Sequence, residues 1–248
     1  MLLRIFERDA REYDHGAMGG SGTWRRLAYS TRTWLGSHRL TYPLLRLARA
    51  GAVVTSRTQA CIEGFPRSAN TWAVFPFRMW NPDVCVAHHV HVPMQIRRAV
   101  SLDVPCAVLV RKPLDALTSL LVMDEDRLSD AVACHSYTTF YDRILDLREH
   151  VVTCTFEEVT EDPFTVVTRL NARYGTDFQG VRLDGDERAA LRDRIERYHR
   201  REGFREAAFT VPSETRRRAA AGVRERLQAH PALEPAEDAY RRWLGKAS

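Results

Sequence analysis

Short apolar segments alternate with longer helical ones through the middle of the chain. The apolar segments are nearly continuous, as in "PCAVLVR", and predict strands at 59–65, 84–92, 105–111 and 151–156. Amphipathic or capped segments between them predict helices at 70–80, 93–101, 113–123 and 127–148. Strands of this kind, each followed by a helix, form a parallel sheet that helices cover on both faces. The chain is therefore predicted to be an α/β protein with a central parallel sheet in a three-layer sandwich.

The two ends of the chain depart from this alternation. Residues 1–58 are predicted to be a basic, partly helical extension, because 15–62 contains seven arginines and no acidic residue. Residues 59–248 are predicted to form the α/β domain, with another helix running from Asp162 (N-cap) and Pro163 to Gly175. The last third, from about 183, is charged and helical. A single domain overall suits 248 residues that are 44% hydrophobic.

The basic N-terminal extension allows two interpretations. "RLTYPLLRLARAG" (39–51) has apolar residues at helical spacing, with Gly51 as a plausible stop. A basic amphipathic helix can lie on an anionic membrane surface, which would make residues 25–50 a peripheral membrane contact. It can equally be a solvated helix that caps the domain.

Charge and cysteine usage limit the class of protein. The net charge is +5, and nearly all the positive charge is arginine, since Lys112 and Lys246 are the only lysines. Arginine binds phosphate in a bidentate way, although a GC-rich coding bias also explains its abundance. The odd number of cysteines, without a CxxC pair, indicates buried free thiols in a reducing cytosol at Cys61, Cys85, Cys106, Cys134 and Cys154. No secretory leader or apolar run of about 18 residues is seen, so we expect a cytoplasmic protein, peripheral to a membrane if the basic helix binds one.

The segment "EGFPRSANTW" (63–72) lies between the first predicted strand and its helix. In an open parallel sheet, ligands bind beyond the carboxyl ends of the strands, and a helix N-terminus offers unpaired N–H groups to an anion. Gly64 and Pro66 shape the turn, and Arg67 supplies a fixed charge beside short polar residues. The alternative is a capped helix start without a ligand, with Ser68 or Asn70 as the N-cap. The loop is not a Walker A motif, which disfavours ATP or GTP hydrolysis.

Two segments in this order resemble the PAPS-dependent sulfotransferases, specifically the bacterial, P-loop-like sulfotransferase domain. "GFPRSANTW" looks like the family's 5′-phosphosulfate loop, and "VLVRKPLDALTSLL" (108–121) looks like its 3′-phosphate segment. A weaker match is "CTFEEVTEDPFTVVTRL", with Phe156 in the place of a tyrosine. The resemblance covers about 59–175. It implies transfer of a sulfuryl group from 3′-phosphoadenosine 5′-phosphosulfate (PAPS) to a hydroxyl group, with 3′-phosphoadenosine 5′-phosphate (PAP) as product and without a metal.

The resemblance also implies which residues bind PAPS. Arg111 and Ser119 take the positions that hold the 3′-phosphate, the group that distinguishes PAPS from ATP. The 5′-phosphosulfate would be held by the loop residues Arg67, Ser68, Ala69, Asn70, Thr71 and Trp72. Trp72 would lie against the adenine, or else pack its helix onto the sheet. For Arg111 and Ser119, the alternative is an arginine capped by Asp115 and a serine on a helix face.

Three histidines in "VAHHVHVP" (86–93) end the second predicted strand. Alternation along a strand would put His89 and His91 on one face and His88 on the other. The segment resembles the family's Lys-x-His-Leu-Pro run, which implies that His91 is the general base and that His89 takes the lysine position. Core histidines bonded to carbonyl oxygens, or a metal site, are the alternatives, although no other ligand lies nearby in sequence.

The chain departs from the family pattern at three places. Arg67 replaces a lysine, and Arg67 remains the third catalytic candidate because it can stabilise charge on the departing phosphate. Ala69 replaces a glycine, which matters if the loop needs a positive φ. The basic segment that completes the 3′-phosphate site has only a weak counterpart at Arg216 or Arg217 in "PSETRRRAAAG".

Two other functions remain open on the sequence. One is a P-loop-like transferase or kinase that uses a nucleotide without a 3′-phosphate. The other is a basic protein that binds an anion or membrane without catalysis, although +5 is a modest charge for nucleic-acid binding. We expect no nucleic-acid partner. The expected acceptor is a small molecule, a saccharide or a glycolipid.

Overall fold

The computed structural model describes residues 52–123, 128–201 and 214–245. Its strands form one sheet, made of β1 (Ala60–Gly64), β2 (Val86–His88), β3 (Cys106–Val110) and β4 (Val152–Thr155). All of these strands are parallel, and they lie in the order β2-β1-β3-β4. The prediction of an α/β fold with a parallel central sheet is confirmed.

Helices connect the strands and complete the chain. The crossover helices are α4 (Asn70–Trp80) after β1, α5 (Pro93–Ser101) after β2, and α6 (Pro113–Met123), α7 (Asp130–Asp142) and the 3₁₀ helix η2 (Leu145–His150) after β3. After β4 come α8 (Phe156–Glu161), α9 (Phe164–Tyr174), α10 (Gly185–Arg201), α11 (Glu214–Gln228) and α12 (Leu233–Trp243). The described residues of the C-terminal third are mainly helical and contain no strand, as predicted.

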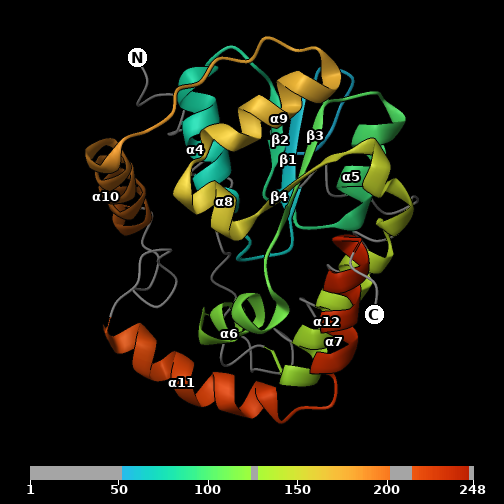
Figure 1. The fold of residues 1–248 in the computed structure, drawn as a ribbon, viewed down its shortest axis with the longest axis vertical. Helices are drawn as coiled ribbons and strands as arrows, with labels where there is room; N and C mark the ends of the chain where they lie inside the picture. Colours follow the sequence, from blue (N-terminus) through green and yellow to red (C-terminus); the bar gives the residue numbers. More distant parts are fainter. Residues whose placement is uncertain (1–51, 124–127, 202–213, 246–248) are drawn as a thin grey trace.

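The helices bury both faces of the sheet and so form three layers. On one face, α4, α8 and α9 pack over side chains such as Ile62 and Leu109, and α10 adds side chains to the same cluster. On the other face, α5, α6, α7, α11 and α12 enclose a second cluster that includes Cys61, Val108 and Trp243. Figure 1 shows these two groups on opposite sides of the strands. Alternate residues of β1 and β3 thus enter opposite cores, as a doubly covered parallel sheet requires.

The strand order reverses between β1 and β3. The chain passes from β1 to β2 on one side and then returns to place β3 on the other side of β1. In open α/β sheets, this switch point leaves a crevice beyond the carboxyl ends of the two strands, where ligands bind. Gly64 and Val110 end these two strands. The loop at 65–69 and Arg111 therefore begin at the place where a ligand site is expected.

Several element boundaries differ from the predictions. The strand predicted at 84–92 ends at His88, because His89 and His91 take a positive φ and leave the sheet. The helix predicted at 127–148 divides into α7 and η2, with Ser129 as N-cap of α7. Residue 156 begins α8, a helix that was not predicted. Helix α9 begins one residue later than expected, although Asp162 Oδ1 still accepts a hydrogen bond from Phe164 N, at 3.1 Å.

The five cysteines do not share one environment. Four are buried, but Cys85 is exposed, because it precedes β2 instead of lying within it. The prediction that all five thiols are buried is wrong at this position. Burial raises the pKa of Cys134 and Cys154 to about 11 each. Contact with the Cys106 thiol, together with burial, raises the pKa of Cys61 well above its ordinary value.

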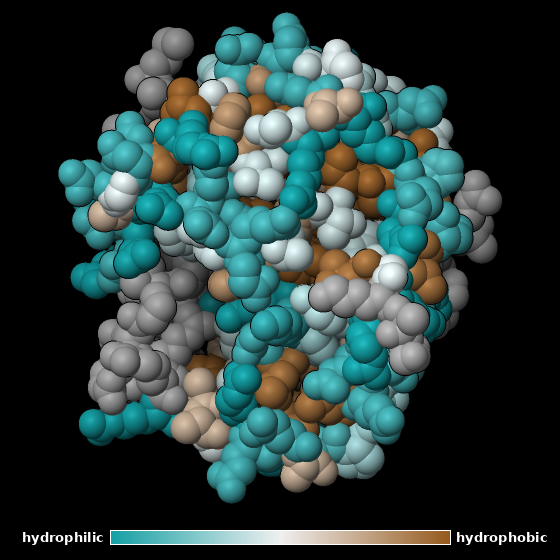
Figure 2. Space-filling model, in the orientation of Figure 1, coloured by the Kyte–Doolittle hydropathy of each residue, from teal (hydrophilic) through white to brown (hydrophobic). Residues whose placement is uncertain are grey.

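On the face drawn in Figure 2, hydrophilic side chains predominate, and apolar ones gather in smaller patches between them. Within the described ranges, no helix is both long and apolar enough to cross a bilayer. The predicted basic helix at 39–51 and the membrane contact at 25–50 lie outside the described residues. Arg216 and Arg217 lie in the first half of α11.

Candidate functional site

The loop between β1 and α4 has an unusual backbone. Arg67 and Ala69 both lie in the left-handed region, with φ of 71° and 69°. Ala69 is the N-cap of α4, and no side chain caps the helix there. The interpretation of Ser68 or Asn70 as an N-cap is therefore wrong. The first turn of α4 offers N–H groups without a side-chain cap at the carboxyl edge of the sheet, a favourable place for an anion.

Two side-chain oxygen atoms of this loop are buried without a hydrogen-bond partner among the described residues. The Ser68 hydroxyl belongs to a residue that is 0% exposed, and Asn70 is 4% exposed. Asn70 Nδ2 donates to Phe65 O at 3.1 Å, but in the part of the chain that the structure describes no donor reaches Asn70 Oδ1 or Ser68 Oγ. Such groups cost about 1–3 kcal/mol each unless a ligand or water satisfies them. The loop thus keeps polar capacity that its own fold does not use.

Arg111 follows β3 and points across the crevice toward this loop. Its Nη1 donates to the Arg67 carbonyl oxygen at 3.0 Å, and its guanidinium lies 3.8 Å from the centre of the Phe156 ring. Within the described part of the chain, Arg111 has no carboxylate in ion-pair contact. Asp115, the predicted cap, pairs with Arg224 instead. Burial lowers the pKa of Arg111, and the more distant charges of Asp115 and Glu157 offset part of this effect.

Ser119 and Arg67 join the two predicted phosphate-binding segments directly. Arg67 Nε donates to Ser119 Oγ at 2.9 Å, although the two residues are 52 positions apart. Arg67 Nη1 also lies 3.7 Å from the Met123 sulfur, so α6 holds the arginine along its last two turns. The three residues predicted to bind the two ends of a nucleotide therefore lie together in the structure.

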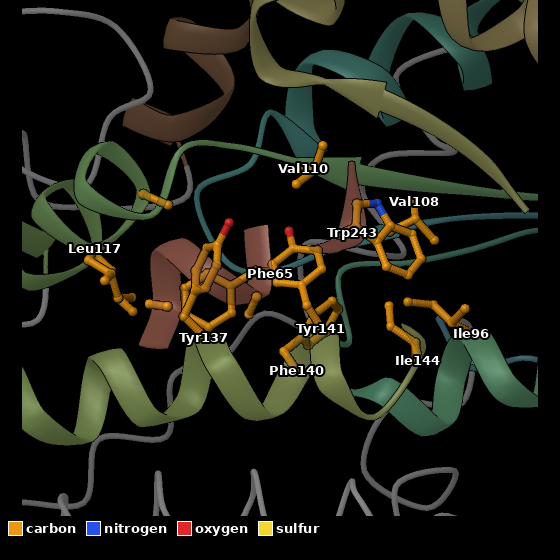
Figure 3. Close-up of a cluster of buried hydrophobic side chains, with 14 of the residues drawn as sticks. Phe65, Ile96, Val108, Val110, Leu117, Tyr137, Phe140, Tyr141, Ile144 and Trp243 are labelled. Carbon is orange, nitrogen blue, oxygen red and sulfur yellow. The ribbon is translucent and has the colours of Figure 1, made fainter. Parts of the chain in front are cut away.

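Two tyrosines of α7 support the end of β3 from below. Figure 3 shows the rings of Tyr137 and Tyr141 rising from α7 with their hydroxyl groups toward the strand that carries Val110. Tyr137 Oη donates to Arg111 O at 2.6 Å, and Tyr141 Oη donates to Leu109 O at 3.1 Å. These bonds fix the backbone from which the Arg111 side chain departs. Burial raises the pKa of both phenols, so they remain protonated donors.

His88 is the last residue of β2, and His89 and His91 lie in the loop that follows it. The prediction that His89 and His91 share a strand face is wrong, since both have positive φ, 55° and 58°, and lie outside β2. The rings nevertheless form a continuous group. His88 Nδ1 lies 2.9 Å from His89 Nδ1, and the rings of His89 and His91 have centroids 5.7 Å apart. His89 Nε2 lies 3.4 Å from Thr71 Oγ1, which connects this loop to the start of α4.

The surroundings of His91 determine which ring nitrogen carries the proton. His91 Nδ1 lies 2.8 Å from the Gly64 carbonyl oxygen, which can only accept a hydrogen bond. The neutral ring therefore holds its proton on Nδ1, and Nε2 is the basic nitrogen. This arrangement suits a general base. It also matches the interpretation of a structural histidine bonded to a carbonyl oxygen.

The structure also bears on the roles considered for Trp72 and for a metal ion. Trp72 is 7% exposed and lies in the core between α4 and the sheet, which agrees with a packing role. In the described ranges, no group of three or more His, Cys, Asp or Glu residues is arranged to hold a metal ion.

Two residues that contact the candidate site were not predicted. The Phe156 ring packs against the Arg111 guanidinium. Glu63, which is 0% exposed, accepts hydrogen bonds from the backbone of the loop after β2.

No family model matches the chain, and no curated protein and no solved structure matches it either. The class that the fold and the site define is an open, doubly covered α/β sheet, with basic and polar side chains gathered at its switch point.

Proposed function

We propose that this protein is a sulfotransferase that moves a sulfuryl group from PAPS to a hydroxyl group of an acceptor. One observation carries the proposal. Arg67, Ser119 and Arg111 belong to two separate segments, and they converge at the switch point between β1 and β3. Arg111 lacks a carboxylate partner among the described residues, and a partly buried guanidinium of this kind is stabilised by a bound anion. The loop with Arg67 and the segment with Arg111 and Ser119 thus meet at one place, which suits a ligand with phosphates at both ends.

Each residue has a role in the proposed reaction. Arg67, Ser68 and the N–H groups at the start of α4 would hold the 5′-phosphosulfate, and Arg111 with Ser119 would hold the 3′-phosphate. The acceptor oxygen attacks sulfur, the bond from sulfur to the 5′-phosphate oxygen breaks, and PAP leaves. His91 Nε2 would take the acceptor proton. Arg67 would stabilise the charge that develops on the departing phosphate, which its permanent positive charge allows.

The nearest rival is a transferase or kinase whose nucleotide lacks a 3′-phosphate. Its nucleotide would have no 3′-phosphate for Arg111, which donates a hydrogen bond to Arg67 O and, among the described residues, has no carboxylate in ion-pair contact. A non-catalytic anion-binding protein would not require the ordered Nδ1 proton of His91. We therefore prefer the sulfotransferase and keep the nucleotide rival as the outcome that a binding experiment can select.

Calorimetric titration of the full chain with PAP and with ADP tests the proposal. We expect PAP to bind at least tenfold more tightly, because one charge-assisted contact to the 3′-phosphate contributes about 1.5–3 kcal/mol. Arg111→Ala should remove that preference and leave ADP binding nearly unchanged. Arg97→Ala, which removes a surface arginine paired with Asp146, is the matched control and should preserve it. Equal affinity for PAP and ADP in the native chain would reject the sulfotransferase.

A further inference from the structure

Glu63 is a fully buried carboxylate at the end of β1, and its hydrogen bonds run to the histidine loop. Its Oε1 accepts from Val90 N at 2.5 Å, and its Oε2 accepts from His91 N at 3.2 Å. A third donor, Gly64 N, lies 3.2 Å from Oε2. Burying a carboxylate is costly unless it is well hydrogen-bonded, so these three donors explain why the core can contain Glu63. They also make Glu63 the link between β1 and the loop after β2.

The loop that Glu63 holds is conformationally expensive. His89 and His91 both lie in the left-handed region, where a residue with a Cβ atom costs about 1–2 kcal/mol. The N–H groups of Val90, which lies between the two histidines, and of His91 itself point to the Glu63 carboxylate. The other side of the loop is fixed by His88 N, which donates to Ala52 O, and by Gln95 Nε2, which donates to the same oxygen. The backbone that carries the His91 ring is thus held from both sides.

The charge of Glu63 lies close to the ring as well as to its backbone. Glu63 Oε2 is 3.6 Å from His91 Nδ1, while Nδ1 faces Gly64 O at 2.8 Å. When Nε2 takes a proton, the ring becomes a cation beside this buried anion, and their attraction is only weakly screened. The ring of His89 also lies beside the His91 ring, and His88 lies beyond it. These two share one proton between their Nδ1 atoms, or else carry positive charge that opposes the effect of Glu63.

We infer that Glu63 is a positioning residue for His91: it fixes the loop backbone through its carboxylate and raises the proton affinity of Nε2 through its charge. The inference rests on the proposed function only in calling His91 a base. Its content is a property of the free protein, the protonation of His91. It can therefore be tested without PAPS, an acceptor or turnover.

The test is an NMR titration of the histidine rings in the full chain. His91→Asn identifies the His91 signal by its loss, because asparagine tolerates a positive φ and its Nδ2 can donate to Gly64 O as Nδ1 does. Glu63→Gln removes the charge and keeps the size of the side chain. We expect it to lower the His91 pKa by about one unit, a tenfold loss of proton affinity. Glu158→Gln is the matched control, since Glu158 also accepts a main-chain hydrogen bond at a strand end, but its carboxylate contacts Thr155 and Arg169. It should leave His91 unchanged.

A folded Glu63→Gln protein with an unchanged His91 pKa would overturn the inference and leave Glu63 as a purely structural carboxylate. If Glu63→Gln does not fold, the native protein decides. Burial alone lowers a histidine pKa, so a native value below about 6 would overturn the inference, and a value at or above the ordinary 6.5 would support it. The sulfotransferase proposal can fail independently. A protein that shows the His91 shift but binds ADP as well as PAP would keep this role of Glu63 and lose the proposed reaction.

Discussion

Residues with a left-handed backbone conformation concentrate at the carboxyl edge of the sheet. Arg67, Ala69, His89 and His91 all have positive φ and lie in the loops after β1 and β2, and Asp103 is the only other such non-glycine in the described chain. Each costs free energy that the surrounding structure must offset, and such residues cluster at functional sites. Here the cost falls on the two loops that carry the proposed anion site and the proposed base. The backbone conformation of these loops therefore lowers the stability of the fold.

Ala69→Gly tests this cost at one residue. Glycine adopts a φ of 69° without the Cβ clash, so we expect the free energy of unfolding to rise by about 0.5–1 kcal/mol. Urea denaturation at fixed pH measures the change. Ala190→Gly makes the same substitution at an exposed position inside α10 and should lower stability by about 1 kcal/mol. If both variants lose stability alike, Ala69 is not strained.

At the residue scale, the sequence indicated which charged residues lie together but not which residues support them. Arg67, Arg111 and Ser119 stand in recognisable segments, and the structure places them in contact. Glu63 sits inside an apolar strand, and its role depends on amide groups that are 27 and 28 positions away. Phe156 supports Arg111 only because β4 pairs with β3. No local pattern contains such long-range contacts.

At the element scale, β1 and β3 approach each other closely at Gly64. A Cβ atom on Gly64 would lie 2.4 Å from Leu109 O and 2.9 Å from Leu109 Cβ, both on the adjacent strand. This closeness keeps the ends of the two strands together where their loops meet. Gly64 is the last residue of β1, so a shift of its backbone also displaces the loop at 65–69 that follows it.

Gly64→Ala is therefore expected to push the two strands apart. We predict a loss of about 1–3 kcal/mol in the free energy of unfolding, measured by thermal or urea denaturation, because Leu109 O is backbone and cannot move aside cheaply. Gly222→Ala is the control. A Cβ atom there meets nothing within 4 Å, and alanine favours the interior of α11, so stability should rise by up to about 1 kcal/mol. A neutral Gly64→Ala would show that the strands can separate without cost.

Helix limits were predicted best where proline or a buried strand set them. The predicted helices 70–80, 93–101 and 113–123 coincide with α4, α5 and α6. The strand predicted at 84–92 was too long, because nothing in the residue types at His89 and His91 signals their positive φ. Helix α8 was missed although Thr155 and Glu158 form a capping box, a pattern visible in "TFEE". A strand-forming run immediately before it concealed the signal.

At the scale of the whole molecule, the C-terminal helices belong to the same core as the sheet. Trp243 at the end of α12 is 1% exposed and packs 5.8 Å from Tyr141, whose hydroxyl reaches β3. Leu227 of α11 and Ala236 of α12 are also buried in that cluster. Arg224 and Arg226 tie α11 to Asp115 of α6 and Asp130 of α7. The charged C-terminal third therefore closes one face of the sandwich.

Trp243→Ala should consequently weaken the entire fold. We expect a loss of about 3–5 kcal/mol, typical of a large aromatic residue removed from a core, with near-UV and far-UV circular dichroism changing together on heating. Trp243→Phe should cost much less, since Trp243 Nε1 has no partner in the described structure to lose. Loss of near-UV signal from α12 alone, at a lower temperature than the rest, would instead mean that the C-terminal helices fold separately.

The unequal burial of the cysteines has a practical consequence. A thiol reagent attacks the thiolate, which is scarce when a thiol is buried and its pKa raised, as at Cys61, Cys134 and Cys154. Cys106 is buried as well, so Cys85 is the one exposed cysteine among the five, all of which the structure describes. It lies just before β2, at the amino ends of the strands, whereas the loop at 65–69 lies at their carboxyl ends. The native sequence thus supplies a position for a fluorescent label that can report on ligand binding without occupying the crevice.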